Sequence, residues 1–134
     1  MTRAAAFARL VLGRTEVSRG NRERGETLVG ESLAPFRQQG NMWRISRALI
    51  VLGAAVLFEN DVDRARATFQ KSLSICRDLE DAEGNALSLL YLGYATHMLG
   101  DEASSSTLLE ESLAVFEDLG DSRAWQRCSS NREE

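Results

Sequence analysis

The chain has 134 residues, of which 43% are hydrophobic and 27% are charged, and these values exclude a disordered or collagen-like protein. Its single proline argues against many short strands joined by tight turns and favours helices. One histidine and two cysteines supply few of the side chains on which most catalytic and metal sites depend.

The charge is distributed unevenly along the sequence. Residues 1–47 contain nine arginines and four acidic residues, a net charge of +5, whereas residues 48–134 contain seven basic and sixteen acidic residues, a net charge of −9. A basic segment can bind nucleic acid. These arginines are scattered, however, and no nucleic-acid-binding motif accompanies them, so the pattern argues against such a partner.

The cysteines and the apolar segments indicate where the protein resides. Cys76 and Cys128 are 52 positions apart without histidine or cysteine neighbours at ligand spacing, which predicts two free thiols and no metal. The most apolar stretch, residues 48–58, has 11 residues, well short of the roughly 20 that a membrane helix needs. We expect a cytoplasmic protein with no membrane partner.

The sequence matches itself when it is shifted by 40 residues. Ser-Leu pairs recur at 32–33, 72–73 and 112–113, and Leu-Gly pairs recur at 12–13, 52–53 and 92–93. We therefore divide a single repeat domain, residues 1–134, into units of about 1–40, 41–80 and 81–120. The start of a further helix follows at 121–128, and a tail at 129–134.

Each unit is predicted to be a pair of helices, because its apolar residues recur at intervals of three and four, as at Leu49, Leu52 and Val56. At Gly100-Asp101 the glycine can end one helix and the aspartate can cap the next. The same signal recurs at Gly40-Asn41, Asn60-Asp61 and Gly120-Asp121. We expect helices at about 3–19, 22–39, 42–59, 62–79, 82–99 and 102–119, and a seventh beginning near Ser122.

Within a unit, the first helix contains a Leu-Gly pair. The second helix contains a small residue, then a bulky residue four positions after it, and then another small residue three positions after the bulky one. These are Leu52-Gly53, Ala65, Phe69 and Ser72 in the second unit, and Leu92-Gly93, Ser105, Leu109 and Ser112 in the third. This pattern resembles the tetratricopeptide repeat, in the long version found in bacterial signalling ATPases and LuxR-type transcription regulators. The resemblance implies an all-α superhelix, a solenoid of three stacked helix-turn-helix repeats plus a short C-terminal helix.

The first unit departs most from the family pattern. Glu16 stands where the family has an aromatic residue, a position filled by Val56 and Thr96 in the later units, and Gly25 replaces the usual alanine. Pro35 falls inside the second predicted helix. Because an interior proline removes a backbone hydrogen bond, we expect a kink or an early end there.

No constellation of catalytic residues is evident in the sequence. His97 is the only imidazole, and no base stands near the hydroxyl groups of Ser104, Ser105 and Ser106. Neither a GxxxxGK[ST] nor a GxGxxG phosphate loop is present. We therefore expect a protein that is not an enzyme, with no cofactor and no metal.

The resemblance also implies a binding surface, since first helices of such repeats line a concave groove. It places in this groove the residue after each Leu-Gly pair and its neighbours one turn away. The apolar members of this set, such as Leu57 and Leu90, are better explained as core residues. The residues expected to contact a partner are Arg14, Arg47, Ala54, Tyr94 and His97.

Two functions remain open from the sequence. The first is a non-catalytic scaffold that binds a peptide or protein partner through the concave groove. The alternative is an architectural or sensor fragment of a larger bacterial transcription regulator or signalling ATPase. Apolar surface exposed at the ends of the repeat array predicts, in either case, self-association into a homodimer.

Overall fold

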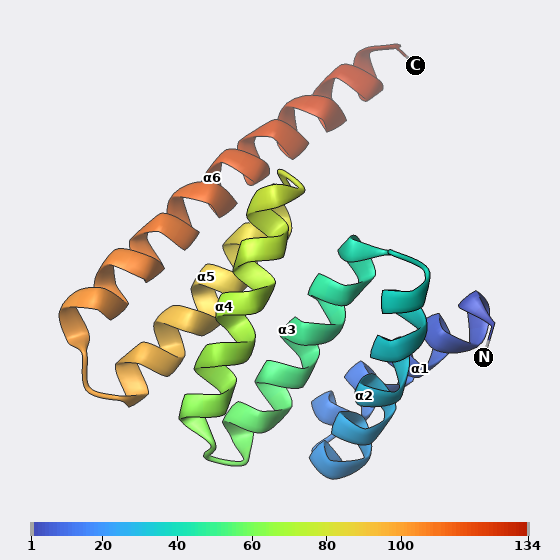
Figure 1. The fold of residues 1–134 in the computed structure, drawn as a ribbon. Coiled ribbons are helices and arrows are strands. Elements are labelled where there is room, and N and C mark those ends of the chain that lie inside the picture. Colours follow the sequence, from blue (N-terminus) through green and yellow to red (C-terminus); the bar gives the residue numbers. More distant parts are fainter. Residues whose placement is uncertain (1, 134) are drawn as a thin grey trace.

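The computed structural model describes the backbone of residues 2–133 and the side chains of residues 2–120. Residues 2–133 form six helices that pack as consecutive antiparallel pairs in an all-α solenoid, which confirms the fold class expected from the sequence (Figure 1). The helices are α1 (Arg3–Ser18), α2 (Arg22–Gln38), α3 (Met42–Phe58), α4 (Val62–Asp78), α5 (Ala82–Met98) and α6 (Glu102–Glu133).

The chain reverses every 20 residues at a left-handed backbone conformation. Positive φ angles occur at Gly20, Gly40, Asn60, Glu80 and Gly100, each just before the next helix begins. Glycine adopts this conformation without steric cost, and asparagine adopts it more readily than most residues. The sequence signals at Gly40-Asn41, Asn60-Asp61 and Gly100-Asp101 are therefore confirmed as helix ends.

Side-chain caps open most of these helices. Asn41, Asp61, Asp81 and Asp101 each accept a hydrogen bond from the backbone N–H three residues later, at 3.1–3.4 Å. Hydrogen bonds from Ser104 hold the pKa of the Asp101 carboxyl below its ordinary value, because they stabilise the charged form. Since a carboxylate also interacts favourably with the helix dipole at this end, the caps reinforce the 20-residue period.

The sixth helix does not end where the sequence predicts. It continues without interruption through Gly120-Asp121 to Glu133, so the expected helix break, the separate seventh helix from Ser122 and the tail at 129–134 are wrong. A reversal that ends the helix is favourable only if the segment after it packs back on the array and buries apolar surface there. The sequence of residues 121–134 contains few apolar residues, and an interior glycine costs a helix only about 1 kcal/mol. The side chains of Trp125 and Cys128 lie outside the described residues.

Pro35 does not shorten its helix. α2 has 17 residues, as do α3, α4 and α5, so the expected early end is wrong. Pro35 lies three residues before the end of α2, where Gln39 N–H still donates to its carbonyl oxygen at 3.0 Å. Because the proline ring removes only one N–H, the last turn is retained.

Glycines let the two helices of a unit approach closely. A Cβ atom at Gly53 of α3 would lie 2.5 Å from the ring of Phe69 on α4, and one at Gly93 would lie 2.8 Å from Leu109. In the first unit the two backbones themselves meet, since a Cβ at Gly25 would lie 2.8 Å from the carbonyl oxygen of Gly13. This contact explains why Gly25 replaces alanine.

Glu16 is also explained by its surroundings. Its residue is only 4% exposed, as buried as Thr96 at the equivalent position of the third unit. Asn21 Nδ2 donates to its carboxylate at 2.8 Å, and the guanidinium groups of Arg19 and Arg24 lie 3.8 and 4.0 Å from it. The first unit therefore replaces an apolar contact with a hydrogen-bonded carboxylate, whose burial requires such partners.

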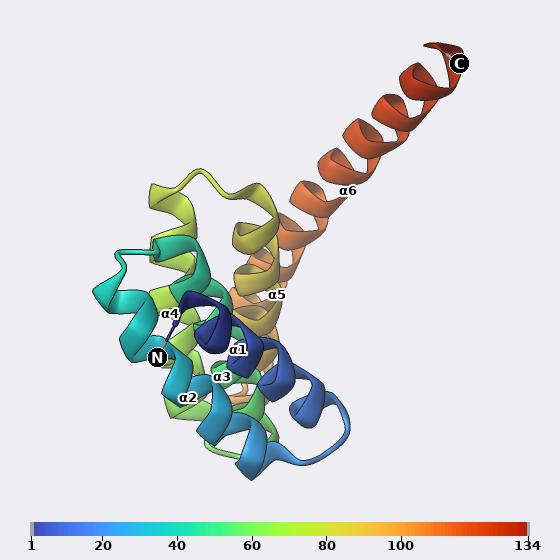
Figure 2. The same ribbon diagram turned by 90° about the vertical axis from the view of Figure 1, so that its right-hand side faces the viewer.

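The second helix of each unit packs against the first helix of the next. Leu33 and Phe36 of α2 share a core cluster with Ile45 and Ala48 of α3, and Leu73 of α4 shares another with residues of α5. The first helices α1, α3 and α5 also approach one another, which curves the array with these helices on its inner side (Figures 1 and 2).

An ion pair ties the second unit to the third. Arg47 Nη2 on α3 lies 3.0 Å from the carboxylate of Asp81, the cap of α5, and both side chains are largely buried. A side chain at Gly84 would overlap Arg47, Asp81 and Cys76. The absence of a Cβ at Gly84 therefore makes room for this pair.

We expect Gly53→Ala to lower the free energy of unfolding by about 1–3 kcal/mol, because the added methyl group overlaps the buried Phe69 ring. Gly30→Ala is the matched control. Gly30 lies within α2 with no atom near its Cβ position, so alanine there should stabilise the protein by about 0.5–1 kcal/mol. Urea unfolding measures both. Equal effects of the two substitutions would contradict the close approach.

Asp81→Ala should lower the free energy of unfolding by about 2 kcal/mol, because it removes a helix cap and the partner of Arg47. Asp61→Ala removes only a cap, so a loss of about 1 kcal/mol is expected. Thermal unfolding followed by circular dichroism compares the two variants. If Asp61→Ala were the more damaging, the ion pair would contribute nothing.

Candidate functional site

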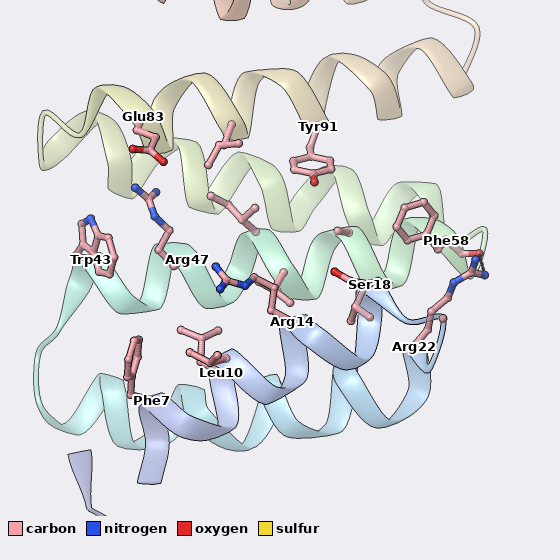
Figure 3. Close-up of a pocket in the computed structure, with 17 residues that line it drawn as sticks. Phe7, Leu10, Arg14, Ser18, Arg22, Trp43, Arg47, Phe58, Glu83 and Tyr91 are labelled. Atoms are coloured by element: carbon pink, nitrogen blue, oxygen red, sulfur yellow. Dashed lines mark hydrogen bonds between the residues drawn. The ribbon is translucent and has the colours of Figure 1, made fainter. Parts of the chain in front are cut away.

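The inner side of the array contains a groove of about 840 Å³. Its walls come from the first helices α1, α3 and α5, and the turn after α1 closes one end. This is the concave surface that the repeat pattern predicts (Figure 3). The lining residues are Phe7, Leu10, Val11, Arg14, Val17, Ser18, Gly20, Arg22, Trp43, Arg47, Ile50, Val51, Ala54, Phe58, Glu83, Leu87 and Tyr91.

The lining positions recur with the 40-residue period of the sequence. Each unit contributes residues spaced by three or four, so one stripe of each first helix faces the groove. Positions equivalent between units include Phe7, Arg47 and Leu87, then Val11, Val51 and Tyr91, then Leu10 and Ile50, then Arg14 and Ala54, and finally Ser18 and Phe58.

Three of the five residues expected in the groove line it and two do not. Arg14, Arg47 and Ala54 are lining residues, whereas Tyr94 and His97 lie outside the groove. Tyr94 is 49% exposed, and His97 places Nδ1 2.9 Å from Oε1 of Glu102 at the surface. Within the described structure no first helix follows α5, so only the α5 stripe that faces α3 contributes to the groove.

Several lining residues were not expected from the sequence, among them Trp43, Arg22 and Tyr91. Tyr91 is fixed by a contact inside the protein. Its ring stacks on the buried ring of Phe69, with centroids 5.2 Å apart and an interplanar angle of 13°. The signal that could have found it was the repeat itself, since Tyr91 is equivalent to Val11 and Val51. The Phe69 ring packs against Gly53 and stacks on the Tyr91 ring, so it holds the Tyr91 phenol at the groove wall.

One end of the groove is built around Arg47. Its guanidinium lies 4.8 Å from the centroid of the Trp43 ring and pairs with Asp81. Figure 3 shows that it also points toward the carboxylate of Glu83. The charge of Arg47 is therefore engaged within the protein, and its contribution to the groove is to hold Trp43 and the start of α5 in place.

The opposite end is closed by Arg22 and Phe58. Arg22 Nη1 donates to the carbonyl oxygen of Phe58 at 3.0 Å, and the guanidinium lies 5.0 Å from the centroid of the Phe58 ring (Figure 3). This contact joins the start of α2 to the end of α3. Among the ion pairs of the described side chains, none involves Arg22.

Arg14 lies between these two ends. Figure 3 shows its guanidinium in the space between α1 and α3, next to the apolar side chain of Leu10. Among the side chains of residues 2–120, none forms a hydrogen bond, an ion pair or a ring contact with Arg14. The centre of the groove thus combines apolar walls with a cation that has no partner in the described part of the chain.

The described residues offer little else on which chemistry could be built. Within residues 2–120, no three side chains of histidine, cysteine, aspartate or glutamate come together as a metal site. Cys76 is a buried free thiol, and the side chain of Cys128 lies outside the described residues. None of the helices described is both long and apolar enough to span a membrane.

Comparison with known proteins gives one family and two similar structures. A tetratricopeptide repeat model matches residues 44–118, and no curated protein sequence matches significantly. The structure is similar to the apo form of RapI, with a TM-score of 0.81 and 18% identity over 87% of this chain and 43% of the RapI chain. It is also similar to the TPR domain of Arabidopsis FLU, with a TM-score of 0.80 and 16% identity over 86% of this chain and 97% of that domain.

The two structural similarities show the fold alone, and this chain spans less than half of the RapI chain. The family match covers more than half of the sequence, and it includes both units in which the glycine and its bulky partner recur. The chain belongs to the tetratricopeptide repeat family.

Proposed function

We propose that this protein is a non-catalytic scaffold that binds a peptide or protein segment in the groove between α1, α3 and α5. The observation that carries the proposal is the guanidinium of Arg14, which has no partner among the side chains of residues 2–120, in an otherwise largely apolar groove. The family supports it, because tetratricopeptide repeat domains are typically protein-interaction modules and are generally not enzymes.

The chemistry of the groove defines the segment that it would accept. Leu10, Ile50, Val51 and Leu87 offer apolar surface, and covering such surface contributes about 25 cal/mol per Å². Arg14 offers a charged donor that a carboxylate can satisfy in two hydrogen bonds. The partner is therefore an apolar segment with one acidic side chain or a free carboxylate near its centre.

Aromatic side chains near the groove ends add to this surface. Trp43 is held by Arg47 at one end, Phe58 by Arg22 at the other, and Tyr91 by Phe69 along the wall. Rings fixed in this way lose little conformational entropy when a ligand covers them. Contacts within the protein therefore preorganise these aromatic side chains, whereas Arg14 has no such contact with a described side chain.

The alternative function is an architectural or sensor segment of a larger bacterial, cytoplasmic transcription regulator or signalling ATPase. The observation that favours it is the match to the longer RapI chain, of which this chain spans 43%. In that role the groove would face another part of the same regulator. Sequencing the adjoining coding region for an ATPase or a helix-turn-helix segment distinguishes the two functions.

Arg14→Gln should weaken binding of an acidic apolar peptide about tenfold, because it removes one charge-assisted pair. The probes are short synthetic helical peptides with one apolar face and a single central glutamate, and otherwise identical peptides with glutamine or lysine there. Isothermal titration should rank glutamate first and lysine last for the native protein. Arg14→Gln should abolish the preference for glutamate over glutamine.

Arg66→Gln on the outer helix α4 is the control, since it removes an exposed arginine outside the groove. It should change neither peptide affinity nor melting temperature. An equal loss from Arg66→Gln would show that the acidic peptide responds only to overall charge, and no binding of any peptide would refute the groove as a site for such segments.

A further inference from the structure

The two ends of the solenoid expose surfaces that the interior of the same solenoid buries. Leu33, Leu73 and Leu113 are equivalent residues of α2, α4 and α6, and they are 7%, 6% and 57% exposed. Leu90 and Tyr94 of α5 are exposed as well, whereas the equivalent Ile50 and Ala54 of α3 are buried. We call Leu90, Tyr94 and Leu113 the C-terminal end face.

At each internal boundary, the first helix of the next unit covers this face. Leu33 shares a cluster with Ile45 and Ala48 of α3, and Leu73 shares one with Leu89 and Leu92 of α5. Positions 48, 52 and 55 of α3 and the equivalent positions 88, 92 and 95 of α5 each hold a leucine between two small residues, and all of them are buried or half-buried. The C-terminal end face thus has the shape that accepts such a stripe.

The other end of the molecule presents that stripe to solvent. Ala8, Leu12 and Thr15 of α1 are exposed, whereas the equivalent Ala48 and Ala55 of α3 are fully buried. Leu12 is 41% exposed, and its equivalent Leu92 is 6% exposed. The Thr15 hydroxyl already donates to the carbonyl oxygen of Val11 at 3.0 Å, so it can be buried without losing a partner. We call Ala8, Leu12 and Thr15 the N-terminal end face.

The two end faces belong to units of opposite charge. Residues 1–40 contain seven arginines and four glutamates, a net charge of +3, whereas residues 81–120 contain eight acidic residues and no lysine or arginine, a net charge of −8. Charge complementarity favours contact between unlike ends and opposes contact between two C-terminal units.

We propose that the N-terminal end face of one copy docks on the C-terminal end face of another, so that copies stack head to tail as the units do within one chain. Contact between the apolar side chains of the two end faces sets how the copies are oriented. The opposite charges of the two terminal units favour contact between an N-terminal and a C-terminal end face. Such a contact is heterologous and does not close on itself by two-fold symmetry, so more than two copies can join. In this assembly Tyr94 would stand beside α1 of the next copy, in the position that Ala54 holds beside α5.

Sedimentation velocity of the full chain over micromolar to millimolar concentrations tests the proposal. The native protein should form species beyond the dimer, and added salt should weaken them because unlike charges are screened. Leu12→Glu or Leu113→Glu, each at an exposed position, should leave single chains. An equimolar mixture of the two variants should form a one-to-one dimer, since each retains the end face that the other needs.

Leu79→Glu is the matched control, because Leu79 is an equally exposed leucine at the end of α4 and on neither end face. It should associate like the native protein. If Leu113→Glu lost helical signal, Tyr94→Glu on the same end face would replace it.

Three results would overturn head-to-tail stacking. The first is a native protein that remains monomeric at every concentration. The second is self-association that survives Leu12→Glu but not Leu113→Glu, which would indicate a symmetric contact between C-terminal units. The third is an equimolar mixture of the variants that stays monomeric.

Discussion

The close approach of the two helices within each unit is the constraint on which the rest of this structure depends. Gly53 admits the ring of Phe69, Gly93 admits Leu109, and in the first unit Gly13 and Gly25 let two backbones meet. Because Phe69 is fixed by this contact, its other face can stack on Tyr91 and hold it at the groove wall. A packing requirement inside the second unit thus sets the position of a candidate binding residue on the third.

Most of the fold could be predicted because the 40-residue period and the helix-ending signals are local in sequence. The reversals at Gly40, Asn60 and Gly100 follow from residues that tolerate positive φ and from the caps after them. Gly120-Asp121 carries the same local signal but lies within α6, because a reversal also needs a following helix with enough apolar surface to bury. Whether this requirement is met depends on the segment that follows, so residues 120–121 alone cannot predict the reversal.

The candidate site could be predicted only in part, for a related reason. The repeat pattern assigns Arg14, Ala54 and Tyr94 to one position, yet only the first two line the groove. A residue at this position faces the first helix of the next unit, and α5 has none after it among the described helices. Tyr91 faces the preceding unit instead and does line the groove. The role of Arg47 was equally hidden, since its pair with Asp81 spans two units.

The three arginines that line the groove differ in what their guanidinium groups contact. Arg47 is neutralised by Asp81 and Arg22 is bound to the Phe58 carbonyl, so both stabilise contacts between units. Arg14 alone among these three is without a partner among the described side chains. Under the proposed function, a carboxylate of the bound segment would pair with this exposed guanidinium. Under the proposed function, the preference of the groove for an acidic segment would come from Arg14, the lining arginine that these contacts leave without a partner among the described side chains.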